Sequence, residues 1–168
     1  MNKTPVKATK VLDEVMEQLP KGAFLTVKYG NRLNTMTIGW GTVGIVWSVP
    51  VFTVGVRTSR HTYNLIEAAP DFTVTVPSDS SCRKALAFCG SKSGKAVDKI
   101  KECELETLAG EQTATPVLAV PGIHFECRIV LRTPMTPDIM APALMEYYPS
   151  EDYHSLYYGE ILASYRTT

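Results

Sequence analysis

The stretch NTMTIGWGTVGIVWSVPVFTVGVRTSRHTYNLI, residues 34–66, carries the strongest structural and chemical signals in the chain. Its first half predicts a strand punctuated by Gly39, Gly41 and Gly44, which would let a flat ligand or another backbone approach closely. A second strand at 51–56 runs directly into the hexapeptide RTSRHT at 57–62. Two guanidiniums, three hydroxyls and the start of a helix together suit a phosphate group. The stretch therefore predicts the site of a phosphorylated, planar cofactor.

Outward from this stretch, short strands and helices follow one another in no regular order. An amphipathic helix is expected at 9–19, because apolar residues recur there at helical spacing. Further strands are expected at 23–29, 72–76, 117–120, 123–131 and 155–165. Further helices are expected at 61–69, with Ser59 as its cap, at 82–88 and at 95–101. A loop is expected at 89–94, an irregular segment at 104–116 and a helical turn at 143–147. Such an order disfavours a doubly wound parallel sheet. It predicts a mainly-β fold, a closed or partly closed barrel with peripheral helices, and one domain over 1–168.

The charge balance narrows the class of partner. Among 168 residues, Lys plus Arg and Asp plus Glu number 17 each, so the net charge is zero. Binding to nucleic acid or to a membrane surface would call for a basic excess, so neither is expected. Basic residues nevertheless gather between Arg57 and Lys101. A local basic field in a neutral chain favours a small anionic ligand.

The N-terminal residues and the cysteines bear on the compartment. The start MNKTPVKATKVLDEV has no apolar core of a signal peptide, and no apolar run approaches the roughly 20 residues that span a bilayer. The four cysteines show no C-x-x-C spacing, and the three histidines show no metal-ligand spacing. We therefore expect reduced thiols, no metal site and a cytoplasmic protein.

Four segments carry a family resemblance when they are taken in order. They are NTMTIGWG at 34–41, VRTSRHTYNLI at 56–66, FCGSKSG at 88–94 followed by Asp98-Lys99, and HSLYYGEI at 154–161. Together they resemble the flavin reductase-like family, which includes flavoredoxins and has the FMN-binding split-barrel fold. The resemblance runs from about residue 20 to 162. One such segment alone would be a weak signal, whereas four in order are specific.

The resemblance implies a homodimer with FMN bound near the interface between subunits. By position, Asn34, Met36, Thr37 and Trp40 would lie along the isoalloxazine and ribityl groups, and His154 and Tyr157 would lie near the ring. The phosphate end and ribityl group would be held by Arg57, Thr58, Ser59, Arg60 and Thr62 together with Ser91, Lys92, Ser93 and Gly94. Charge-assisted donors of this kind suit a phosphate dianion.

The implied function is an FMN-dependent oxidoreductase that passes electrons from NADH or NADPH through FMN to a flavin or another acceptor. We nominate no catalytic side chain, since the flavin itself carries the hydride chemistry. One alternative is a flavoredoxin-like carrier that holds FMN tightly and is reduced by a redox partner, and another is a non-catalytic flavin-binding module. No G-x-G-x-x-G fingerprint indicates the nucleotide preference. The roles of His124 and of Tyr147–Tyr158 remain open at this point.

Overall fold

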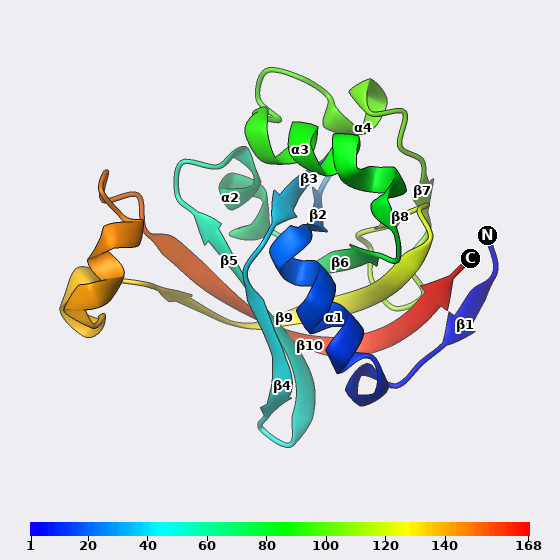
Figure 1. Cartoon of the computed structure of the whole chain (residues 1–168), viewed down its shortest axis with the longest axis horizontal. Coiled ribbons are helices and arrows are strands. Elements are labelled where there is room, and N and C mark those ends of the chain that lie inside the picture. Colours follow the sequence, from blue (N-terminus) through cyan, green and yellow to red (C-terminus); the bar gives the residue numbers. More distant parts are fainter.

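The computed structural model describes residues 1–168, the whole chain (Figure 1). Four α-helices are present: α1 (Leu12–Gln18), α2 (His61–Ile66), α3 (Arg83–Ser91) and α4 (Lys99–Glu102). The strands are β1 (Lys3–Pro5), β2 (Ala23–Tyr29), β3 (Arg32–Ile38), β4 (Gly41–Val46), β5 (Val49–Arg57), β6 (Asp71–Pro77), β7 (Thr107–Leu108), β8 (Val117–Leu118), β9 (Gly122–Pro134) and β10 (His154–Thr167). No helix is long and apolar enough to cross a membrane.

One antiparallel sheet dominates the molecule. Its strands are hydrogen-bonded in the order β3-β2-β6-β9-β10-β5-β4, with β1 added along β10. The two long strands β9 and β10 pair through the centre, and their register shifts at Tyr158/Gly159 and again at Ile161/Ala163. Such irregularities bend a strand and increase its twist. The sheet can therefore curl, and β9 and β10 reach beyond it toward the arm of 3-10 helix at Pro142–Tyr147 (Figure 1).

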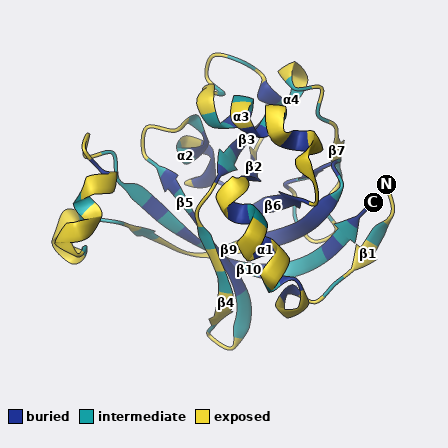
Figure 2. Ribbon diagram, viewed as in Figure 1, coloured by how far each residue is buried: buried dark blue, intermediate teal, exposed yellow.

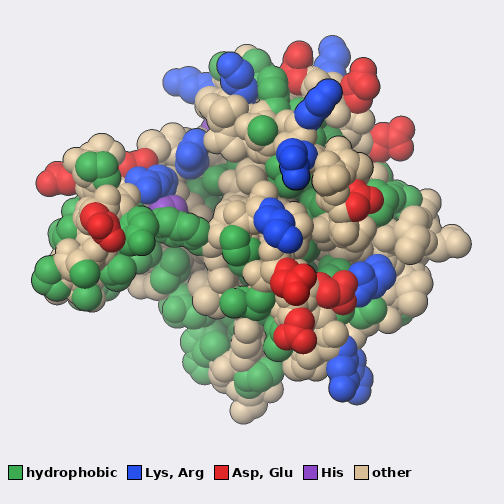
Figure 3. Space-filling view, viewed as in Figure 1, with side chains coloured by type: hydrophobic (Ala, Val, Ile, Leu, Met, Phe, Trp, Pro, Cys, Tyr) green, Lys and Arg blue, Asp and Glu red, His purple; other side chains and the backbone are tan.

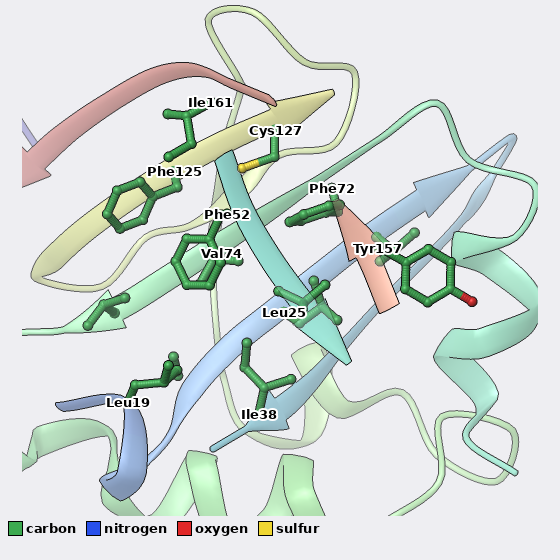
Figure 4. Close-up of a cluster of buried hydrophobic side chains, with 14 of the residues drawn as sticks. Leu19, Leu25, Ile38, Phe52, Phe72, Val74, Phe125, Cys127, Tyr157 and Ile161 are labelled. Atoms are coloured by element: carbon green, nitrogen blue, oxygen red, sulfur yellow. The ribbon is translucent and has the colours of Figure 1, made fainter. Parts of the chain in front are cut away.

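The curled sheet encloses a single large core. Leu25 and Ile38, from β2 and β3 at one end of the strand order, share one apolar cluster with Phe52 from β5 near the other end. Figure 4 shows these side chains converging with Phe72 and Phe125. Figure 2 shows the complementary pattern, in which the strands around the core are largely buried and most of the arm is exposed. The sheet thus folds around the core, as a mainly-β fold predicts.

The stretch 34–66 contains three strands, and the expected single strand through its glycines is wrong. β3 ends at Ile38, and β4 begins at Gly41. The change of partner explains the break, because β3 pairs with β2 whereas β4 pairs with β5 on the other side of the sheet order. The β4–β5 hairpin turns at Trp47 and Ser48, whose φ angles of 51° and 62° are those of a tight primed turn.

Several helix boundaries differ from the expected ones. α3 continues to Ser91, through the first part of the expected loop at 89–94. α4 begins only at Lys99, because the Asp98 carboxylate caps it by accepting hydrogen bonds from the amides of Ile100 and Lys101. The expected cap of α2 is also wrong, since the N-cap residue is Arg60 and no side chain caps that helix. The short strands β1 and β7 were not expected. The expected helical turn at 143–147 is confirmed, as the 3-10 helix of the arm.

Gly159 in β10 gives a stability prediction, because the core leaves no room for a methyl group at that position. A Cβ atom there would lie 2.5 Å from Cζ of Phe72 and 2.6 Å from Cβ of Cys127, and both side chains are fully buried. We expect Gly159→Ala to lower the free energy of unfolding by about 1–3 kcal/mol, the usual effect of overpacking. Gly44→Ala is the matched control, since nothing lies within 4 Å of its added Cβ. Urea denaturation of both variants tests this, and equal midpoints would contradict it.

Candidate functional site

Two adjoining cavities lie beside the end of β3, where the polar hexapeptide leaves β5. The first, of about 180 Å³, is bounded by Trp40, Arg57 and His154 and is called the aromatic cavity. The second, of about 110 Å³, is bounded by Ser59, Thr62, Ser91 and Ser93 and is called the hydroxyl cavity. Met36 and Arg60 line both cavities. Because they share these two residues, the cavities adjoin and form one site. Arg and Lys side chains line this site and no Asp or Glu side chain does, so it is positively charged.

The aromatic cavity has ring walls and free backbone groups. The Trp40 ring, half exposed, lies 5.0 Å from the His154 ring and 5.8 Å from the Tyr147 ring, measured between centroids. Gly39 and Trp40 lie between two strands, and none of the backbone hydrogen bonds outside the helices and strands involves them. A flat heterocycle could therefore meet both aromatic surface and unpaired backbone donors and acceptors there.

His154 forms an uncharged polar wall of the aromatic cavity. Burial, together with the nearby cations Arg57 and Arg60, lowers its pKa to about 4 against an opposing effect of Asp152. The imidazole is therefore neutral near pH 7. Its Nδ1 lies 2.9 Å from the hydroxyl of Tyr148, which holds the ring in place. The position of His154 follows from sheet pairing, because it is opposite Arg57 in the register of β10 and β5.

Arg57, Thr58 and Ser59 are engaged by the segment that leads into β10. The Arg57 guanidinium donates to the backbone carbonyls of Asp152 and Tyr147, each at 3.0 Å. The hydroxyls of Thr58 and Ser59 and the amide of Ser59 all donate to the Asp152 carboxylate, at 3.2, 2.6 and 3.1 Å. The sequence predicts these three residues at the phosphate end, but their donors hold this segment: Arg57 lines only the aromatic cavity, Ser59 lines the hydroxyl cavity, and Thr58 lines neither.

Arg60 and the loop after α3 supply the free positive charge of the hydroxyl cavity. The Arg60 guanidinium donates to the Gly90 carbonyl at 3.3 Å, which leaves further N–H groups available. Lys92 also lines this cavity. Ser91 donates back to carbonyls of α3, and the Ser93 hydroxyl accepts from the amide of Lys95. Neither Arg60 nor Lys92 takes part in any of the three salt bridges of the chain.

Gly94 closes the hydroxyl cavity against β3. A Cβ atom at this position would lie 2.1 Å from Oδ1 of Asn34 and 2.9 Å from Cδ2 of His61, so only glycine fits. Asn34 is itself buried, and its amide nitrogen donates to the Thr62 hydroxyl at 2.8 Å. The predicted Asn34, Thr62 and Gly94 thus meet as one packed unit, although Asn34 lines neither of the two cavities.

Thr37 and Tyr157 have other partners. Thr37 lines the aromatic cavity, but its hydroxyl donates to the Leu86 carbonyl at 2.6 Å and so joins β3 to α3. Tyr157 is fully buried in the main core and donates to the Glu67 carboxylate at 2.7 Å, and it lines neither cavity (Figure 4). The structure therefore separates Tyr157 from the other predicted ring contacts. His124 is also remote from the cavities, between the hydroxyls of Thr75 and Thr167.

Several residues at the cavities were not predicted as part of the site, and two of the unpredicted residues, Lys99 and Asp152, make hydrogen bonds that shape it. Lys99 is 5% exposed, lines the hydroxyl cavity and donates through Nζ to the Cys89 carbonyl at 2.8 Å. Burial lowers the pKa of this lysine. Its place in the Asp98-Lys99 dipeptide was a usable sequence signal. No sequence signal indicated Asp152, because its role depends on the pairing of β10 with β5.

The donor set fits a flavin mononucleotide. A planar ring system needs aromatic surface and backbone hydrogen bonds, which the aromatic cavity offers beside Gly39 and Trp40. A phosphate needs charge-assisted donors, which Arg60, Lys92 and Lys99 offer in the hydroxyl cavity. None of these cations is neutralised by a salt bridge, as a site built for an anion requires.

Comparisons with known proteins agree with this fit. A flavoredoxin from Methanosarcina acetivorans superimposes with a TM-score of 0.67 at 26% identity, over 87% of this chain and 68% of the other. The FMN-binding domain of a flavin reductase-like enzyme from Shewanella baltica gives a TM-score of 0.71 at 18% identity, over 98% and 77%. An NADH:FAD oxidoreductase from Streptomyces globisporus gives 0.65 at 20% identity, over 98% and 89%. No curated protein sequence matches the chain.

These structures share the mainly-β fold with peripheral helices, so the predicted fold class is confirmed. The family model described as the flavin reductase like domain matches residues 16–166, nearly the whole chain. That match confirms the resemblance carried by the four sequence segments, and it brings a flavin-related redox role. The chain belongs to the flavin reductase-like domain family.

Proposed function

We propose that the chain is an FMN-dependent oxidoreductase that takes electrons from NADH or NADPH and passes them to a flavin or another acceptor. One observation carries the proposal: an aromatic cavity and a cationic, hydroxyl-rich cavity adjoin at Met36 and Arg60, with no carboxylate on either wall. This arrangement matches the two ends of FMN. The family match and the NADH:FAD oxidoreductase with a similar fold support the same chemistry.

The side chains of the site would bind the flavin, orient it and shield its ring system. Arg60, Lys92 and Lys99 would hold the phosphate, and Trp40 would cover part of the ring system. The neutral His154 adds an uncharged polar wall to the aromatic cavity. When bound, the flavin supplies the hydride-accepting and electron-donating chemistry, so no side chain needs to act as acid or base.

A visible spectrum of the purified protein tests the proposed function. We expect a flavin spectrum in the protein as isolated or after addition of FMN and removal of the excess. Under anaerobic conditions NADH or NADPH should then bleach the visible absorbance of the flavin, and admission of an acceptor should restore it. A colourless protein that fails to retain added FMN would refute the proposal.

A second candidate function is a flavoredoxin-like electron carrier, and the 26% identity to a flavoredoxin favours it. Such a carrier would hold FMN tightly and receive electrons from a redox protein. The same spectral experiment separates the two candidates. NADH and NADPH would bleach a carrier slowly or not at all, whereas a reduced ferredoxin-like donor would bleach it quickly.

We further propose that the chain works as a homodimer. Large apolar side chains are exposed along the β4–β5 hairpin, on β9 and on the arm at Pro142–Tyr147, among them Ile45, Trp47, Val130, Leu131 and Leu144. Figure 3 shows hydrophobic side chains gathered over the arm and the hairpin. Exposed apolar side chains gathered in this way mark an interaction site. Light scattering should give twice the mass of the chain, and a monomer at micromolar concentration would contradict the proposal.

A further inference from the structure

Two cysteine thiols meet at the ends of the segment that carries the loop of the hydroxyl cavity. Cys89 lies in the last turn of α3 and lines that cavity, and Cys103 is the C-cap of α4. Cys103 packs against the small apolar cluster that contains Cys89, and its side chain is near enough to hydrogen-bond the Cys89 thiol. All four cysteines of the chain are free thiols. Cys89 and Cys103 are therefore neighbouring thiols that no bond joins.

The other two cysteines are not placed to join this pair. Cys82 is the N-cap of α3, which puts it about 10 Å from Cys89 along the helix, whereas the Cα atoms of a disulfide lie at most about 7 Å apart. Cys127 is fully buried in the main core, in a different apolar cluster. The geometry thus selects one pair among the four thiols.

The two thiols differ in the way that a stepwise oxidation requires. Burial raises the pKa of the Cys89 thiol to about 12, and the neighbouring Cys103 adds to this effect, so Cys89 stays protonated and is a poor nucleophile on its own. Cys103 is only partly buried, so a small oxidant can reach its sulfur. The Lys99 ammonium interacts electrostatically with both thiols, and a cation in this position stabilises the negative charge of an attacking sulfur. Cys103 is therefore the thiol that reacts first.

We propose that hydrogen peroxide converts Cys89 and Cys103 into a reversible disulfide, and that this bond weakens the binding of a flavin phosphate in the hydroxyl cavity. In the first step the Cys103 sulfur attacks the peroxide, the O–O bond breaks, and a sulfenic acid forms while the thiol proton leaves with the other oxygen as water. In the second step the Cys89 sulfur displaces the hydroxyl of the sulfenic acid, which leaves with the Cys89 proton as a second water. A thiol reductant reverses the bond.

The disulfide would act on the hydroxyl cavity because the loop of that cavity lies between the two cysteines. The closed segment contains Ser91–Gly94 and Lys99, all of which line the cavity. Lys99 donates to the Cys89 carbonyl at 2.8 Å, so the position of its ammonium depends on the spacing of α3 and α4, which a short connection joins (Figure 1). Bonded sulfurs lie about 2 Å apart, closer than any unbonded pair, so the disulfide would draw the two helix ends together.

The loop has no room to follow such a movement. Gly94 is packed so closely against Asn34 that even a methyl group would not fit between them. Drawing α3 and α4 together would therefore distort the hydroxyl cavity and displace its cations from a bound phosphate. This second part of the inference rests on the proposed flavin site, whereas formation of the disulfide does not.

Thiol counting after peroxide treatment tests the disulfide. The reduced protein is exposed to hydrogen peroxide, unfolded in urea and alkylated with a maleimide, and its intact mass gives the number of thiols that remain. We expect wild type to lose two of its four thiols and to regain both with dithiothreitol, and Cys82→Ser to lose the same pair. Cys103→Ser should lose none, and Cys89→Ala should stop at a sulfenic acid that dimedone traps. A wild type that keeps all four thiols, or that forms bonds only between two chains, overturns the proposal.

The FMN affinity of the oxidised protein tests the effect on the cavity. We expect oxidised wild type to bind FMN at least about tenfold more weakly than the reduced protein, the equivalent of one charge-assisted hydrogen bond, and to bind riboflavin equally in both states. Cys103→Ser, treated with peroxide in the same way, should bind FMN as reduced wild type does. A disulfide that leaves FMN affinity unchanged, or that weakens FMN and riboflavin alike, overturns the link to the phosphate. A reduced wild type that binds no flavin refutes the proposed function, and the thiol count still decides whether the disulfide forms.

Discussion

Glu126→Ala is expected to destabilise the fold by about 3–5 kcal/mol, because it removes a buried carboxylate that several donors share. Glu126 in β9 is fully buried. Its oxygens accept from the amides of Glu111, Gln112 and Thr113, at 2.7–3.0 Å, and from the hydroxyls of Thr113 and Tyr165. Alanine would remove the shared acceptor and leave the Tyr165 hydroxyl unpaired away from water, and a buried group without a partner is costly. Urea denaturation of the variant measures the loss.

Glu160→Ala is the control for this prediction. Glu160 lies on β10 and pairs with Arg128 at 2.6 Å, but more than half of the Arg128 side chain is exposed. An exposed ion pair contributes about 0–1 kcal/mol. A loss in Glu126→Ala no larger than that in Glu160→Ala would show that the segment 111–113 and Tyr165 find other partners.

The stability contribution of Glu126 should depend on pH in a defined direction. Burial alone would raise the pKa of this carboxyl, but hydrogen bonds from the backbone of Glu111 and Gln112 and from the side chains of Tyr165 and Thr113 outweigh burial, and the pKa is lowered. The contribution is therefore complete above the unfolded-state pKa of about 4.3 and is lost as the pH falls through the folded-state value. Glu126→Gln, which cannot titrate, should show a shallower loss of stability below about pH 4.5.

Two histidines set the background of that experiment. Burial lowers the pKa of His124 and of His154 to about 4, so both stay neutral in the fold until the pH is well below their unfolded-state value of about 6.5. They remove stability as the pH falls between these two values, in wild type and variant alike. The difference between Glu126 and its glutamine replacement isolates the carboxylate.

The sequence predicts the centre of the site well because the decisive signals there are local. Arg57 is the last residue of β5, and Arg60 lies three residues after it. Ser91 is the last residue of α3, and Lys92, Ser93 and Gly94 follow it directly. Those features need only a strand, a turn and a helix in the right order. The structure brings Arg60 together with Lys92 and Ser93 around one cavity, as the four motifs indicate.

What the sequence does not show depends on long-range pairing. The engagement of Ser59 by Asp152 requires that β10 pair with β5, and 93 residues separate the two partners. The break at Gly39 likewise reflects a change of partner strand that no local pattern records. Tyr157 is different, because the alternation along β10 places it on the same buried face as Ser155 and Ile161. The period of two could have assigned Tyr157 to the core.

Arg60→Ala should weaken FMN binding by about 10- to 100-fold, equivalent to roughly 1.5–3 kcal/mol for a lost hydrogen bond to a charged group. Arg60 is the arginine that lines both cavities, and its guanidinium has a single protein acceptor, the Gly90 carbonyl. The Arg57 guanidinium already donates to the carbonyls of Tyr147 and Asp152. It therefore cannot replace the lost guanidinium of Arg60 without breaking those two hydrogen bonds.

The comparison of FMN with riboflavin makes the Arg60 prediction specific to the phosphate. Riboflavin has the same ring and ribityl group without the phosphate, so its affinity for Arg60→Ala should stay within about twofold of wild type. Arg60→Lys should recover part of the FMN affinity, because the charge returns without the planar fork. Arg83→Ala, an exposed arginine that lines neither cavity, controls for net charge. Flavin fluorescence titration measures all of these affinities. Equal losses for FMN and riboflavin would place Arg60 against the ring instead, and an unchanged FMN affinity would place the phosphate away from the hydroxyl cavity.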